Sequence, residues 1–182
     1  MILFIFRVPK YVICQDPTHI KNNEDMGSFC SSAARHNIDH QTQINAPIAK
    51  LWAAMIDIDH WEKWNKWTTL EAIEAKTGVS GKLHACYEGD GKWEDFDFTF
   101  GEVDEATHTM AWFGKVAGGF LFHGQHQMRL EAVSPTVTLL VHQEEFSGLL
   151  PALNAGLPYA KLRRNYLLMN EALKAHVEVI EK

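Results

Sequence analysis

Hydrophobic and polar positions alternate from the point where regular patterning begins, at His36. Between 38 and 44, Ile38, His40, Thr42 and Ile44 alternate with polar residues, and a period of two predicts a strand. Asn45-Ala46-Pro47 supplies a capping residue and a proline, as expected where a helix begins. Helical spacing of apolar residues then predicts a short amphipathic helix with Ile48, Leu51, Trp52 and Met55 on its apolar face. A second short helix is predicted over 59–65.

Six more strands are predicted downstream, each ended by turn residues. They cover 70–75, 82–88, 93–103, 108–115, 120–133 and 136–146. The last two meet across Ser134-Pro135, a turn in which the missing proline N–H removes no ladder bond.

The hydrophobic period changes after Ser147-Gly148. From Pro158 onward, apolar residues recur every three or four positions, at Leu162, Tyr166, Met169, Leu173, Val177 and Ile180. This spacing predicts an amphipathic helix of ~20 residues, about 30 Å long. Seven strands with one buried face need a cover, and this helix is the only candidate large enough. The sequence therefore predicts an α+β helix-grip fold: a curved antiparallel sheet around a long C-terminal helix, with a pocket between them.

The last hairpin carries the candidate chemistry. With its turn centred on Ser134, His126 would pair with His142 and Met128 with Leu140. His126, His142 and Glu144 would then share the inward, otherwise apolar face. Such a cluster has three interpretations: a satisfied polar network, polar recognition of a ligand, or a metal site of two histidines and one carboxylate. A histidine with a carboxylate partner could also act as an acid–base pair.

Aromatic and thioether side chains on the inward face are candidate pocket walls. Residues of these types are more often plain core than pocket wall. The predicted ligand-binding set comprises Trp64, Trp67, Phe98, Trp112, His126, Met128, Leu140, His142, Glu144, Phe146, Tyr166 and Met169.

Composition excludes several classes of function. The formal charge is −6 and no basic run is longer than Arg163-Arg164, which argues against nucleic-acid binding. Three widely spaced cysteines without a CxxC motif argue against a disulfide framework or structural zinc, and favour a reducing compartment, so we expect a cytoplasmic location. No apolar stretch approaches the ~20 residues of a transmembrane helix. The chain also lacks nucleotide-binding and serine-hydrolase motifs.

The first 35 residues differ from the rest, and we expect a disordered or loosely attached extension over 1–35 and one domain over 36–182. If translation began at Met26, Met26-Gly27-Ser28-Phe29-Cys30-Ser31 would match the pattern for N-myristoylation, with Cys30 available for palmitoylation. Membrane anchoring is expected only in that case, because stable anchoring takes two lipid signals.

The order of these elements resembles the START-like or SRPBCC superfamily, in particular its polyketide cyclase/dehydrase-like branch. The resemblance covers roughly 38–178 and is carried by five segments: Ile44–Pro47 with Leu51-Trp52, Asp57 with Trp61 and Trp64, Met110–Gly114, His126–Leu130 and Thr138–Gly148. It implies the helix-grip fold but does not choose among lipid carriers, receptors and cyclases.

From sequence we therefore expect a protein that binds a hydrophobic small molecule, such as a lipid, an isoprenoid or an aromatic polyketide. One alternative is an enzyme of cyclase or dehydratase type that uses His126, His142 and Glu144. A third possibility is an interaction module whose cavity is mostly filled. We expect neither a metal nor a cofactor, and the sequence leaves the oligomeric state open.

Overall fold

The computed structural model of the chain describes residues 36–178. The predictions for 1–35, including the start at Met26 and its lipidation, lie outside these residues. So does Ile180, the last position of the predicted apolar stripe.

Seven strands, a long C-terminal helix and four short helical segments make up the described chain. The strands are β1 (Ile38–Ile44), β2 (Thr68–Glu71), β3 (Ser80–Ala85), β4 (Glu94–Asp104), β5 (Thr109–Val116), β6 (Phe122–Ser134) and β7 (Val137–Ser147). The helices are α1 (Ile48–Ile56), the 3-10 turns η2 (Ile58–Lys63) and η3 (Ala117–Gly119), the short α2 (Leu149–Ala152) and α3 (Tyr159–Val177). The predicted order of seven strands, two short helices after the first strand and a long C-terminal helix is confirmed. The segments η3 and α2 are additional, and the strand predicted over 70–75 ends at Glu71.

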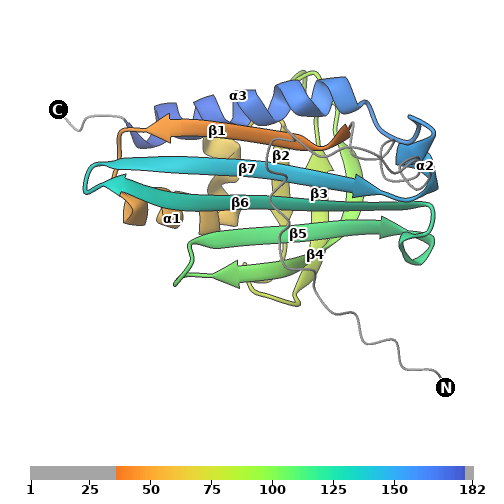
Figure 1. Ribbon diagram of the computed structural model, residues 1–182, viewed down its shortest axis with the longest axis horizontal. Helices are drawn as coiled ribbons and strands as arrows, with labels where there is room; N and C mark the ends of the chain where they lie inside the picture. The colour runs from red at the N-terminus through yellow and green to blue at the C-terminus, as the bar shows by residue number, and fades with distance from the viewer. Residues whose placement is uncertain (1–35, 179–182) are drawn as a thin grey trace, which may run out of the picture.

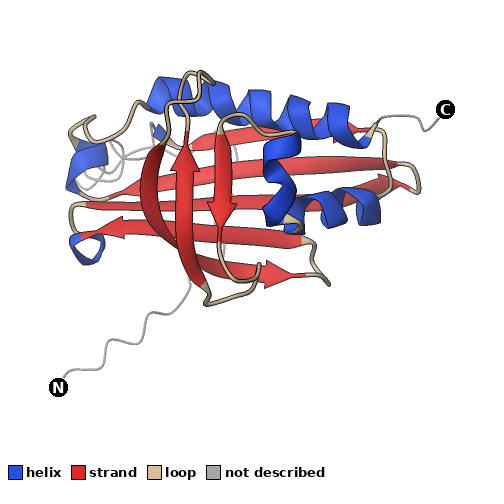
Figure 2. Cartoon of the chain, turned by 180° about the vertical axis from the view of Figure 1, so that it is seen from behind, coloured by secondary structure: helices blue, strands red, loops and turns tan. Residues whose placement is uncertain are grey.

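All seven strands form one antiparallel sheet in the order β1-β7-β6-β5-β4-β3-β2. The sheet curls so strongly that β2 and β3 cross the direction of β6 and β7 (Figures 1 and 2). The helix α3 lies along the concave side, next to β1 and β7 (Figure 1). The α+β helix-grip fold is confirmed.

The register of the last hairpin differs from the prediction by two residues. His126 pairs with Glu144 and Met128 with His142. The loop is the two-residue Pro135-Thr136, and a bulge between Ala132 and Ser134 adds one residue to β6. The slip is even, so every side chain keeps its predicted face.

The prediction that Asn45 caps α1 is wrong. The capping position is Pro47, without a side-chain hydrogen bond, and the Asn45 backbone N–H donates to the Glu178 carboxylate at 2.6 Å. The hydroxyl of Thr138 on β7 donates to the Ala46 carbonyl at 2.9 Å. These two tertiary contacts hold the segment between β1 and α1 in place, and α1 begins after Pro47.

The space between sheet and helix is filled only at one end. There the C-terminal half of α3 contributes Met169 and Leu173, both fully buried, and α1 contributes Leu51 and Met55. Met110, Met128 and Leu140 of the sheet complete this core with other buried side chains. The N-terminal half of α3 faces the other end, which is hollow.

The hollow end is bounded by α2, which packs against the turn between β5 and β6. The Leu149 and Leu150 backbone N–H groups donate to the carbonyls of Phe120 and Leu121 at 3.1 and 2.9 Å. Gly148 makes this approach possible: its φ is +107°, and a Cβ there would lie 2.8 Å from the Leu121 carbonyl oxygen.

Replacing Leu173 by alanine tests whether this half of α3 holds the fold. Leu173 is fully buried, and Leu→Ala at such sites costs about 2–5 kcal/mol of unfolding free energy. Leu167, on the same helix, is 45% exposed, and its alanine variant should change stability by less than about 0.5 kcal/mol. Urea denaturation measures both, and equal costs would contradict the packing described.

Candidate functional site

A cavity of about 380 Å³ occupies the hollow end of the grip. This volume lies in the ~300–1,000 Å³ range of small-molecule sites. It is lined by residues of all strands from β2 to β7, of the loop after β3, of the α2 region and of the first turns of α3. Its apolar side chains are Leu83, Ala85, Phe96, Phe98, Trp112, Val116, Phe122, Leu150, Leu157 and Leu162.

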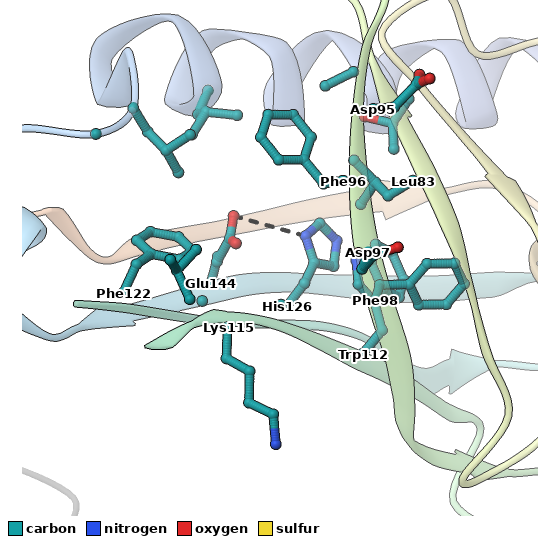
Figure 3. A pocket seen from close by; sticks show the side chains of 18 of the residues that line it. Leu83, Asp95, Phe96, Asp97, Phe98, Trp112, Lys115, Phe122, His126 and Glu144 are labelled. Carbon is teal, nitrogen blue, oxygen red and sulfur yellow. Dashed lines mark ion pairs between the residues drawn. The ribbon is translucent and has the colours of Figure 1, made fainter. Parts of the chain in front are cut away.

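The polar groups on the cavity wall gather on β6, β7 and α3. His126 and Glu144 are directly paired across the hairpin, and the His126 Nδ1 lies 3.8 Å from the Glu144 Oε2 (Figure 3). Tyr166 reaches down from α3 and donates its hydroxyl to the same carboxyl oxygen. Tyr87 and Thr68 also line the cavity.

Behind this wall, a buried chain of hydrogen bonds extends from His126 to β1. The His126 Nε2 lies 2.8 Å from the His142 Nε2, and the His142 Nδ1 lies 2.5 Å from the Asn170 Oδ1. The Asn170 amide in turn donates to the Thr42 hydroxyl at 3.1 Å. All four residues are buried, so each polar contact replaces one that water would supply.

Stacking holds the two imidazole rings in place. Trp112 lies flat on His126 with ring centroids 3.9 Å apart, and Tyr166 lies flat on His142 at 4.6 Å. The ring planes are therefore fixed by their neighbours as well as by hydrogen bonds.

Burial keeps these groups uncharged over a wide pH range. It lowers the pKa of His126 to about 3 and that of His142 well below its ordinary value. Burial raises the pKa of Glu144 to about 7, against the opposing hydrogen bond from Tyr166. It also raises the pKa of Tyr166, where the neighbouring Glu144 acts in the same direction.

The other charged residues of the lining direct their charges elsewhere. Asp95 and Asp97, on β4, bind partners on β3. The Asp95 carboxylate lies 2.7 Å from the His84 ring, and the Asp97 carboxylate lies 2.6 Å from the Lys82 ammonium. The Lys115 side chain points away from the cavity (Figure 3), and its ammonium lies 5.7 Å from the Phe113 ring centroid. Among the lining residues, Glu144 is therefore the acid that faces the interior.

Five of the predicted ligand-binding residues line the cavity: Phe98, Trp112, His126, Glu144 and Tyr166. His142 lies one contact behind the wall. Phe146 belongs to a second buried cluster with Tyr159 and Leu162. The remaining five lie in or against the filled core and do not line the cavity: Trp64, Trp67, Met128, Leu140 and Met169.

Sequence reasoning missed Asn170 and Tyr87. Asn170 lies four residues after Tyr166 and three before Leu173, a spacing that puts a polar residue on the buried helix face. That misfit could have revealed it. Tyr87 follows β3 in a loop whose path no local pattern specifies.

The predicted triad does not form a metal site in the structure. Within residues 36–178, no three His, Cys, Asp or Glu side chains converge as metal ligands. The facing nitrogens of His126 and His142 are 2.8 Å apart, at hydrogen-bonding distance from each other. None of the helices in this range is long and apolar enough to cross a membrane.

Comparison with known proteins places the chain in a family. The profile described as "Polyketide cyclase / dehydrase and lipid transport" matches residues 35–178. The chain belongs to this family. No curated protein matches it.

Several solved structures share the fold of this polyketide cyclase-family chain. The Zhui aromatase/cyclase from Streptomyces sp. R1128 has a TM-score of 0.64 at 18% identity, covering 78% of this chain and 93% of its own. Ara h 8.0201 has a TM-score of 0.56 at 22% identity, with coverages of 78% and 97%. Truncated norcoclaurine synthase from Thalictrum flavum has a TM-score of 0.58 at 11% identity, with coverages of 80% and 94%. At these identities the likeness establishes the fold.

The raised pKa of Glu144 predicts a specific pH dependence of stability. Between pH 4.5 and about 7 the folded state keeps a proton that the unfolded chain has released, so this group makes stability fall as pH rises. Glu144→Gln removes that loss, and its stability relative to wild type should rise by up to about 3 kcal/mol across this window.

Urea denaturation at a series of pH values measures the difference. Glu145→Gln is the matched control, because Glu145 is exposed on the opposite face of β7. Its stability relative to wild type should stay nearly constant. A flat difference for Glu144→Gln would contradict the raised pKa.

Proposed function

We propose that this family member binds a small molecule with an apolar, ring-containing body and one uncharged polar end. The observation that carries the proposal is the cavity, apolar and aromatic over most of its wall, with His126, Glu144 and Tyr166 gathered at one place. That combination is the usual composition of a small-molecule site.

The flat side chains support a ring-shaped ligand. Phe98, Trp112 and Phe122 contribute aromatic surface to the lining, and aromatic pairs gain about 0.5–1.5 kcal/mol beyond area burial. Of the three ligand classes expected from sequence, an aromatic polyketide fits these walls best.

The absence of an inward cation among the described lining residues supports an uncharged polar end. His126 stays neutral, Lys115 points outward, and Glu144 is half ionised near pH 7. A buried carboxylate or phosphate of a ligand would have no counter-charge here, which costs several kcal/mol. A hydroxyl or carbonyl group can hydrogen-bond without that penalty.

Filling the cavity tests the binding proposal. Gly114 lies on β5 in the lining, and a Cβ there would be in ordinary contact, 3.4 Å from the Asp97 carbonyl oxygen. Gly114→Leu should lower affinity for the neutral fluorescent probe phenylnaphthylamine by about ten-fold or more, or about 1.4 kcal/mol. Lys115→Leu, one residue on and facing outward, should bind the probe like wild type.

Fluorescence titration of the full chain measures these affinities. Native mass spectrometry of the same samples shows whether an organic adduct co-purifies and is lost on denaturation. Equal probe affinity in Gly114→Leu and wild type would place binding outside the cavity and overturn the proposal.

A dehydratase activity is the second candidate, and the pKa of Glu144 favours it. A general base is most effective with a pKa near the operating pH, and Glu144 has about 7 whereas His126 has about 3. Ionised Glu144 would take the α-proton of a β-hydroxyketone. As the carbon–carbon double bond forms, it would return that proton to the departing hydroxyl, which leaves as water.

Glu144→Gln distinguishes this reaction from simple binding. With an aryl β-hydroxyketone that dehydrates to an ultraviolet-absorbing enone, turnover should fall about 10²-fold or more while affinity is retained. Absorbance follows the reaction, and Glu145→Gln serves as control. If the wild-type protein binds this ketone but does not turn it over, dehydratase activity is excluded for this substrate class.

A further inference from the structure

Asn170 occupies the centre of the buried hydrogen-bonded chain without touching the cavity. It is fully buried on α3, and its amide nitrogen donates to the Thr42 hydroxyl at 3.1 Å. Its carbonyl oxygen therefore faces the His142 Nδ1, at 2.5 Å. A carbonyl oxygen can only accept, so the proton between them belongs to the His142 Nδ1.

This proton determines the state of the next ring. Burial keeps His142 neutral, so a ring that carries its proton on Nδ1 has a lone pair on Nε2. That Nε2 lies 2.8 Å from the His126 Nε2. Two lone pairs at this distance would repel each other, so the His126 Nε2 carries a proton and donates it. Neutral His126 then has an unprotonated Nδ1.

The unprotonated Nδ1 belongs to the cavity wall and lies beside Glu144. Its distance to the Glu144 Oε2 is 3.8 Å, which is too long for a hydrogen bond. Tyr166 already donates to that oxygen. The His126 Nδ1 is thus a hydrogen-bond acceptor on the cavity lining, and the nearby Glu144 carboxyl is too far away to donate to it.

We propose that Asn170 is a positioning residue that fixes the tautomers of His142 and His126, and so makes the His126 Nδ1 an acceptor for a hydroxyl group of the ligand. The inference rests on the proposed function and deepens it. A ligand with an O–H at its polar end, such as a phenol or an enol, matches this wall better than one that only accepts hydrogen bonds.

Nitrogen-15 NMR of the full chain without ligand tests the tautomers directly. On the acid side of the Glu144 pKa, the His142 proton should reside on Nδ1 and the His126 proton on Nε2. The nitrogen shifts and their couplings to the ring carbon protons identify the protonated nitrogen. A proton on the His126 Nδ1 in wild type would overturn the proposal without any variant.

Two substitutions at Asn170 separate positioning from packing. Asn170→Leu removes the acceptor, and a buried N–H without a partner is costly, so the His142 proton should move to Nε2 and that of His126 to Nδ1. Asn170→Asp keeps an acceptor and should restore the wild-type tautomers. Asn165→Leu is the control: Asn165 is buried on the same helix but donates to the Tyr87 carbonyl, at 3.1 Å.

Failure of this inference is distinguishable from failure of the proposed function. Unchanged tautomers in a folded Asn170→Leu protein would refute the role of Asn170 even if phenylnaphthylamine still bound the cavity. If Asn170→Leu does not fold, the wild-type tautomers and those of Asn170→Asp decide. Loss of the expected pattern in Asn170→Asp would count against the role of the acceptor.

Discussion

The packing of α3 into the concave face of the sheet is the contact on which the rest of this structure depends. A seven-stranded sheet with one apolar face has to bury that face, and α3 supplies the longest apolar stripe available to it. The stripe is not uniform. Its second half carries Met169 and Leu173, which fill the space, whereas its first half carries Leu162 and Tyr166, which line a cavity. One helix therefore serves both as core and as wall.

The boundary between the two halves is where the polar groups lie. Thr42, Asn170, His142 and His126 form a chain from β1 to the cavity, closed at its end by Glu144 and Tyr166. Unpaired polar groups at such depth would each cost about 1–3 kcal/mol, so the chain is stable only because its members satisfy one another. With the proposed tautomers, every hydrogen bond between His126 and Thr42 also points the same way: His126 donates to His142, His142 to Asn170, and Asn170 to Thr42.

Burial makes this wall chemically selective. The histidines lose their ability to become cations at ordinary pH, while Glu144 retains a proton up to about pH 7. The same desolvation therefore disfavours anionic ligands and gives one carboxyl a pKa suited to proton transfer. The two proposed functions, binding and dehydration, would both use this one environment.

Much of the fold could be read from the sequence because the decisive signals are local. Alternation over 38–44 and the helical stripe from Leu162 to Val177 specify which faces are buried, and the pleat keeps those faces even when the register slips. The inward positions of His126 and Glu144 followed in this way. The hairpin partners did not, because the turn is formed by Pro135-Thr136 rather than centred on Ser134 and a bulge lies between Ala132 and Ser134; together these change the pairing by two residues.

The tertiary structure alone decided which inward residues line the cavity. Met128 and Leu140 have the same local pattern as Trp112 and His126, yet α1 covers the former and leaves the latter beside a hollow. The hydrogen bond between Asn170 and His142 joins residues 28 positions apart on different elements, and Thr42 is 128 positions from Asn170. Periodicity assigns a side chain to a face. Only the curl of the sheet and the placement of the helices decide what that face contacts.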